Sequence, residues 1–254
     1  MPIYHLERRY VSRKKGYSAC AGSAYISGQI INCLYYDIQF DYTKHLWQVV
    51  SSKLLLPPEA PVEFRDNPKL LWSMAEMWEK RKDSRVAEEL IVSFPIELSL
   101  IECENIIDKY IKKHFVSRNI GAQIAIHDKR DGNPHAHIIL TTRFINRDGF
   151  GEKDRGWTKN FLMSLRKGWA DIQNREFEKK GLECRVSHLS NVERGIDKIP
   201  SKRISKKEVK LKKQGIKSQR VLDNEKIEKL NQENELKKQQ KREVHRKKSR
   251  GIER

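Results

Sequence analysis

Three histidines have the spacing of a metal site. His135 and His137 are two residues apart, and side chains at that spacing in a β-strand point to the same face. Between His127 and His135 lie the steps Asp131-Gly132 and Asn133-Pro134, which favour reversal of the chain. A hairpin here would place His127 opposite His135, with the two Cβ atoms about 5 Å apart. The pattern therefore predicts three imidazoles that converge on one divalent ion.

An ion held in this way would favour phosphate chemistry. Neutral imidazoles suit a borderline transition metal such as Mn²⁺ or Zn²⁺ better than Mg²⁺, and three protein ligands leave open positions for a phosphate oxygen. The ion could then act as a Lewis acid on a phosphodiester. The nucleophile would be either water or a side-chain hydroxyl, and the residue pattern does not choose between them. The remaining histidines singled out lack this spacing and are expected to be structural or at the surface: His5, His45, His114 and His188.

Several strands and helices must position these histidines. Strands are expected at residues 3–7, 89–94, 120–127, 135–143 and 185–189, from alternating or β-rich runs. A run of small residues predicts a helix over residues 17–28 that ends at Gly28. Three further helices begin at recognisable start signals, which are Asn67-Pro68, Ser99 with Glu102, and Thr158. A strand followed by a helix indicates an α/β or α+β architecture.

The charge of the chain indicates a polyanionic partner. Lysine and arginine number 52 against 34 aspartate and glutamate residues, a net charge of +18, which favours nucleic acid through counterion release. The alternative is a basic surface that aids solubility or contacts acidic proteins. Residues 1–200 are expected to form one folded domain. Residues 201–254 have too few apolar groups for a core and are expected to form a basic tail, partly helical or disordered.

The composition also indicates a cytoplasmic protein. The four cysteines form no CxxC pair and are expected to be reduced. No apolar run approaches the roughly 20 residues of a membrane span, and the first residues lack the layout of a signal peptide.

Several motifs together resemble the MobA/MobL family, also called MobQ-type relaxases. The match covers about the first 200 residues, and its main segments are Ile3-Tyr4-His5-Leu6, Ala24-Tyr25-Ile26-Ser27-Gly28, Asn133-Pro134-His135-Ala136-His137-Ile138 and Thr141-Thr142-Arg143. The resemblance implies the HUH endonuclease fold, an α+β class with a mainly antiparallel sheet flanked by helices. It also implies that Tyr25 is the nucleophile and that the three histidines hold the metal. Glu89 stands at the family's acidic position, where it would orient a ligand histidine or help deprotonate the tyrosine.

The implied activity is that of a metal-dependent DNA relaxase. Such an enzyme nicks and rejoins one DNA strand at a plasmid origin of transfer and forms a 5′-phosphotyrosine intermediate. Mn²⁺ or Mg²⁺ are the leading ions and Zn²⁺ or Ni²⁺ follow. The implied partners are single-stranded or extruded origin DNA, accessory nicking-complex proteins, the coupling ATPase of a secretion channel, and a host or partner helicase, since the chain lacks a GxxxxGK[ST] loop.

Two departures from the family pattern keep alternatives open. Ile26 stands where the family commonly has a basic residue after the tyrosine, so activity would be weaker or would recruit Arg13, Lys14 or Lys15. The family's usual features are also blurred around residues 185–190. The alternatives are a rolling-circle replication initiator with the same chemistry, and a non-catalytic origin-binding or autorepressor protein.

Overall fold

The computed structural model describes residues 4–251, and it describes the backbone alone for Lys206 and residues 242–251. Contacts within the chain divide it into two compact units, Met1–His188 and Leu189–Arg254. The expected division near residue 200 stays a prediction, and each unit is described by itself below.

An antiparallel sheet of five strands forms the centre of the first unit. Its strands, in the order β1-β5-β7-β6-β4 across the sheet, are β1 (Leu6–Ser12), β5 (Arg85–Ser93), β7 (His135–Thr141), β6 (Ala122–His127) and β4 (Val49–Leu55). Two small antiparallel hairpins accompany it, β2 (Ile30–Cys33) with β3 (Ile38–Asp41) and β8 (Arg143–Asn146) with β9 (Gly149–Lys153). The α+β class with a mainly antiparallel sheet is confirmed.

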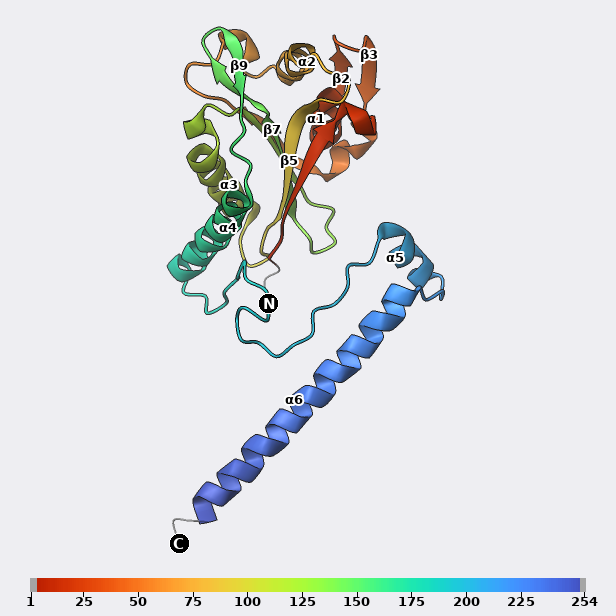
Figure 1. Cartoon of the computed structure of the whole chain (residues 1–254), viewed down its shortest axis with the longest axis vertical. Coiled ribbons are helices and arrows are strands. Elements are labelled where there is room, and N and C mark those ends of the chain that lie inside the picture. The colour runs from red at the N-terminus through yellow and green to blue at the C-terminus, as the bar shows by residue number, and fades with distance from the viewer. Residues whose placement is uncertain (1–3, 252–254) are drawn as a thin grey trace. The chain divides into compact units, whose positions relative to one another are not determined.

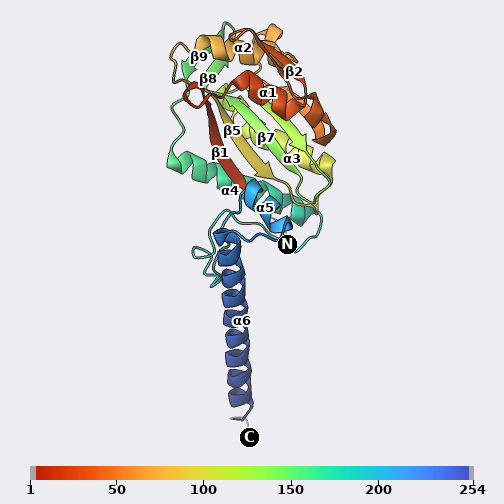
Figure 2. The same ribbon diagram turned by 90° about the vertical axis from the view of Figure 1, so that its right-hand side faces the viewer.

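Helices cover both faces of this sheet (Figure 1). They are α1 (Ala19–Ser27), α2 (Pro68–Trp78), α3 (Leu100–His114) and α4 (Lys159–Lys179). Apolar side chains of α3 and α4, such as Ile107 and Trp169, pack on one face with Leu90 and Ile138 of the central strands. Figure 2 shows α1 in front of the opposite face, where small side chains such as Ala24 meet Ile139. The two faces therefore have separate cores.

The start of α1 is held by buried polar groups. The Ser18 hydroxyl accepts hydrogen bonds from the amides of Cys20 and Ala21. The Glu76 carboxylate of α2 accepts the Ala19 amide at 2.7 Å and is fully buried. These contacts satisfy amides at the helix N-terminus that would otherwise lack partners.

Arg13 neutralises this buried carboxylate. It forms an ion pair with Glu76 at 3.1 Å, and its guanidinium also donates to the backbone carbonyls of Glu76 and Glu79. Removing one partner of such a pair leaves an uncompensated buried charge. Because Arg13 directly follows β1, the ion pair links the C-terminal end of β1 to α2.

The end of α1 lies against the next segment of chain. Gly28 has a φ of 64°, and a Cβ at this position would lie 2.7 Å from the Cα of Leu46. Leu46 belongs to the 3-10 helix η2 (Thr43–Gln48), which leads into β4. Only glycine combines this left-handed conformation with such a close approach.

This contact predicts a difference between two alanine substitutions. Gly16 has a similar φ of 72° but open space around it, so Gly16→Ala should cost only the left-handed strain, about 1–2 kcal/mol. Gly28→Ala should cost the same strain and a further 1–3 kcal/mol, roughly, for displacing η2. Urea unfolding of both variants measures the difference, and equal losses would show that η2 is not held by this contact.

The second unit contains α5 (Lys206–Lys213) and α6 (Gln219–Gly251). A capping box of Ser205 and Glu208 begins α5. The segment before α5 is tied to α6, because the amide and carbonyl of Ile199 bond the Asn231 side chain. The basic tail was expected to be either partly helical or disordered, and the structure describes helices in it.

Most of the expected elements are confirmed, with two corrections. The Asn67, Ser99 and Thr158 helix starts are found, and each of these side chains accepts a backbone amide in the first turn of its helix. The strand expected over residues 185–189 is wrong, since this segment has no regular structure; the Val186 backbone bonds the Asn174 side chain instead. The strand expected to end at residue 7 continues to Ser12 in β1, and residues 1–3 lie outside the described residues. Among the described helices, none is long and apolar enough to span a membrane.

Candidate metal centre and tyrosine

The three predicted histidines lie together on the face of the sheet that α1 covers. His127 of β6 is directly opposite His135 of β7, as the hairpin predicts. One ring nitrogen of each residue lies within 4.8 Å of those of the other two. His137 completes the cluster, with its ring centroid 4.9 Å from that of His127 and 5.3 Å from that of His135.

Each of these imidazoles has one nitrogen engaged by an acceptor. His135 Nδ1 lies 2.9 Å from the Asn133 carbonyl, His137 Nδ1 lies 3.0 Å from the Glu89 carboxylate, and His127 Nε2 lies 2.7 Å from the Ile26 carbonyl. Because these oxygens only accept, each engaged nitrogen carries a proton and the other nitrogen of the neutral ring carries a lone pair.

The donor set fits a divalent transition metal. The second nitrogen of His127, Nδ1, is buried and has no hydrogen-bond partner among the described residues, which is costly unless a ligand binds it. Outer hydrogen bonds of the kind made by His135 and His137 commonly orient metal-binding imidazoles. The three rings together offer three lone pairs and leave further coordination positions open.

Burial keeps two of these imidazoles neutral. It lowers the pKa of His127 to about 4, assisted by the neighbouring histidines and opposed by the Ile26 carbonyl. It also lowers the pKa of His135. Neutral rings are the form that binds a metal.

Glu89 of β5 is bound to the cluster through His137. Its side chain is largely buried, and its carboxylate accepts a hydrogen bond from His137 Nδ1. Of the two roles implied for Glu89, this contact favours the orientation of a ligand histidine over deprotonation of the tyrosine. The catalytic role of Glu89 itself stays a prediction.

Substitution of Glu89 is expected to weaken metal binding. Glu89→Ala should lower the Mn²⁺ affinity about 10- to 100-fold, because His137 loses the acceptor that fixes its ring. Glu89→Gln should lose less, since its amide oxygen can still accept the Nδ1 proton. Calorimetric titration with Mn²⁺ measures both. Wild-type affinity in the alanine variant would contradict an orienting role.

Tyr25, in the last turn of α1, packs directly on this cluster. Its ring centroid lies 5.8 Å from that of His137 and 6.2 Å from that of His127, with edge-to-face geometry. Two residues outside the histidine cluster enclose it further, Tyr42 at 5.6 Å and His45 at 5.4 Å. Tyr25 is half-buried, so the predicted nucleophile and the predicted metal ligands form one site.

The surroundings of Tyr25 favour the protonated phenol when no metal is present. Burial raises its pKa above 10, and the charge of Glu89 raises it further. Arg9 opposes this, and it lies opposite Glu89 on β1. A nucleophilic Tyr25 would therefore need a cation close to its hydroxyl.

The structure adds to the expectation for one basic residue and corrects it for another. His45, expected to be structural or at the surface, lies outside the histidine cluster and packs on Tyr25. Arg13 was considered as a replacement phosphate contact, yet it is buried in the ion pair with Glu76. Arg9 lowers the pKa of Tyr25 while its guanidinium is paired with the Glu7 carboxylate at 2.9 Å, and no local motif distinguishes it from its basic neighbours. The long-range pairing of β1 with β5 places it there.

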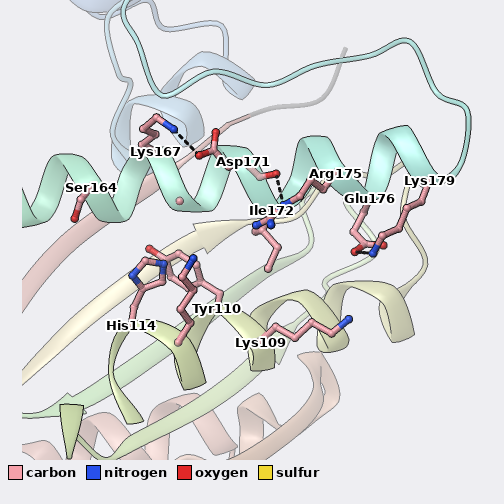
Figure 3. Close-up of a pocket in the computed structure, with 12 residues that line it drawn as sticks. Lys109, Tyr110, His114, Ser164, Lys167, Asp171, Ile172, Arg175, Glu176 and Lys179 are labelled. Atoms are coloured by element: carbon pink, nitrogen blue, oxygen red, sulfur yellow. Dashed lines mark hydrogen bonds and ion pairs between the residues drawn. The ribbon is translucent and has the colours of Figure 1, made fainter. Parts of the chain in front are cut away.

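A separate hollow lies between α3 and α4 (Figure 3). It has a volume of about 480 Å³, and several of its charged side chains pair with one another, Lys167 with Asp171 and Lys179 with Glu176. The Tyr110 hydroxyl is engaged by the Leu165 carbonyl. These helices cover the sheet face opposite the histidines, so this hollow is distinct from the candidate metal centre.

Comparison with known proteins identifies the family of this chain. The model of the MobA/MobL family matches residues 17–214, which include Tyr25, Glu89 and all three histidines. The chain belongs to the MobA/MobL family. The resemblance inferred from its motifs is confirmed.

Curated relatives of this MobA/MobL chain carry mobilization and conjugal transfer names. It is 34% identical over 160 residues to a protein of Bifidobacterium longum named "probable mobilization protein MobA", covering 63% of this chain and 27% of that protein. It is 26% identical to a MobL mobilization protein of Acidithiobacillus ferridurans, covering 80% of this chain and 62% of that protein. The chain therefore spans about a quarter to three fifths of the length of these two relatives.

A solved structure with substantial identity has the same fold. It is described as the molecular basis of vancomycin resistance transfer in Staphylococcus aureus, and it is 31% identical to the MobA/MobL chain. The match has a TM-score of 0.69 and covers 74% of this chain and 99% of that one.

The fold explains in part why Ile26 stands where the MobA/MobL family commonly has a basic residue. Its side chain is buried in the core between α1 and the sheet, where a charged side chain would be costly. Its backbone carbonyl engages His127. This position therefore contributes to the site through its backbone.

Proposed function

We propose that this chain is a relaxase that nicks one DNA strand at an origin of transfer, with Tyr25 as nucleophile. The observation that carries the proposal is the packing of Tyr25 against the His127, His135 and His137 cluster. The mobilization and transfer names of the relatives support the origin of transfer as the DNA target. The net charge of +18 supports DNA as the substrate.

The proposed reaction is a transesterification. The Tyr25 hydroxyl oxygen forms a bond to phosphorus as the bond from phosphorus to the 3′ oxygen breaks. The strand then carries a free 3′-hydroxyl on one side and a 5′-phosphotyrosine on the other. The tyrosine proton is balanced by the proton that the leaving 3′ oxygen gains. Because the phosphodiester-like bond is conserved, a 3′-hydroxyl can reverse the reaction and rejoin the strand.

The three histidines are the proposed metal ligands. A divalent ion bound there would polarise a phosphate oxygen and stabilise the tyrosine phenolate. Mn²⁺ suits both the imidazole donors and phosphate oxygens; Mg²⁺, Zn²⁺ and Ni²⁺ are further candidates. Glu89 would hold His137 in orientation, and Arg9 would favour negative charge on Tyr25.

The proposed partners follow from the same activity. They are single-stranded or extruded origin DNA, accessory nicking-complex proteins, a coupling ATPase at a secretion channel, and a host or partner helicase. We place this activity in the cytoplasm, where origin DNA is available.

A denaturing gel tests the proposal. The protein is incubated with supercoiled DNA that carries the transfer region of its own genetic element, with Mn²⁺, Mg²⁺, Zn²⁺ or Ni²⁺ in separate reactions or with a chelator. We expect a protein-linked 5′ strand with Mn²⁺ and none with the chelator. Cleavage that leaves a free 5′-phosphate would indicate hydrolysis, and no cleavage with any of the four metals would favour a protein that only binds DNA.

A further inference from the structure

The helix η2 (Thr43–Gln48) contacts the candidate site at several points. The His45 ring lies 5.4 Å from the Tyr25 ring, and Leu46 lies against Gly28 at the end of α1. The Gln48 carbonyl accepts the Asp128 amide at 2.9 Å. The next residue, Val49, is paired in the sheet with His127. The backbone on both sides of Trp47 is therefore fixed to the metal and tyrosine cluster.

Trp47 itself is turned away from both cores. Its side chain is 70% exposed, which is more than any other aromatic side chain that the structure describes. By contrast, Trp72 and Trp169 are fully buried. Neighbouring Leu46 is 54% exposed, so the apolar surface extends beyond the indole. Trp47 and Leu46 together present exposed apolar surface next to the candidate site, the kind of surface that a ligand can cover.

We propose that Trp47 is a stacking platform for an unpaired base of the DNA strand that Tyr25 cleaves. The inference rests on the proposed function and deepens it, because it names a nucleotide-binding position next to the cleaved phosphate. An indole stacks on any base, since every base has a flat π face. Lys44, exposed on the same short helix, supplies charge for the adjoining phosphate.

Single-stranded DNA fits this surface better than other occupants do. Trp47 lies only two residues from His45, which contacts the proposed nucleophile, so a strand bound at Tyr25 passes close to η2. A base flanking the cleaved phosphate must be unpaired to reach a protein ring, and stacking compensates for the lost base stacking. The chain's positive charge opposes close approach of a second copy and attracts DNA.

The test uses oligonucleotides that span the mapped cleavage position. Each carries a single abasic nucleotide, and the position of the abasic nucleotide is moved along the strand. Affinities are measured by fluorescence anisotropy at fixed salt for the wild type, Trp47→Ala and Trp47→Phe. Trp78→Ala is the matched control, because Trp78 is also exposed, at 42%, but lies beside Phe150 instead of Tyr25.

We expect Trp47→Ala to lower the affinity for the intact strand on the order of tenfold. Trp47→Phe should retain most of the affinity, because a phenyl ring still stacks, and Trp78→Ala should bind as the wild type does. The wild type should lose a similar factor at one abasic position near the cut, and Trp47→Ala should be insensitive to that position.

Three outcomes would overturn the proposal. Equal affinities of the wild type and Trp47→Ala, while the wild type still binds and nicks, would remove the platform but leave the proposed function. A change in self-association, measured by light scattering, without a change in DNA affinity would identify a second copy as the occupant. A wild type that neither binds nor nicks any strand would overturn the platform and the proposed function together.

Discussion

Tyr25→Phe is expected to abolish the covalent DNA adduct while leaving DNA binding close to that of the wild type. The substitution removes the only atom of the side chain that could attack phosphorus. The phenylalanine ring preserves the edge contacts with His127 and His137. We expect the nicking rate to fall at least about 1,000-fold, as is typical when a nucleophile is removed. Denaturing gels for the adduct and anisotropy for binding give the two measurements.

Tyr42→Phe is the matched control for this prediction. Tyr42 lies beside Tyr25, at 5.6 Å between ring centroids, and loses the same hydroxyl. If proximity to the cluster were enough, both variants would lose the adduct. Nicking that persists in Tyr25→Phe would mean that water or another side chain is the nucleophile.

His135→Ala is expected to abolish most metal binding and, with it, metal-dependent nicking. The variant removes one of three proposed ligands, which should lower the Mn²⁺ affinity by at least about 100-fold, more than the loss of an outer hydrogen bond does. His135 is the most exposed of the three histidines, so its loss should disturb the core least. Calorimetric titration measures the affinity, and circular dichroism checks that the fold is retained.

His45→Ala provides the comparison for the metal site. His45 also packs on Tyr25 but does not belong to the cluster of three histidines. We expect this variant to bind Mn²⁺ with wild-type affinity. Equal losses in the two variants would mean that general disruption around Tyr25, instead of ligand removal, weakens binding. Wild-type affinity in His135→Ala would contradict the three-histidine metal centre.

The parts of the fold that follow local rules could be predicted from the sequence. The Ser99 and Glu102 capping box begins α3 because both of its hydrogen bonds form within one helical turn. The turn around Asp131 sets the hairpin register, so His127 was correctly predicted to lie opposite His135. The strand prediction for residues 185–189 was wrong because this β-rich segment has no partner strand. The Val186 backbone bonds the side chain of Asn174 in α4 instead.

The sequence by itself determined which residues form the candidate metal site, since two histidines alternate on one strand and the third follows from a short hairpin. Its motifs also identified the family and predicted Tyr25 as the nucleophile. Only the tertiary structure decided what surrounds the tyrosine. The pairing of β1 with β5 brings Arg9 to Glu89, and the contact of Gly28 with Leu46 brings His45 to Tyr25. These contacts join segments far apart in the chain, and their geometry depends on which faces the sheet and helices bury together, which no local spacing encodes.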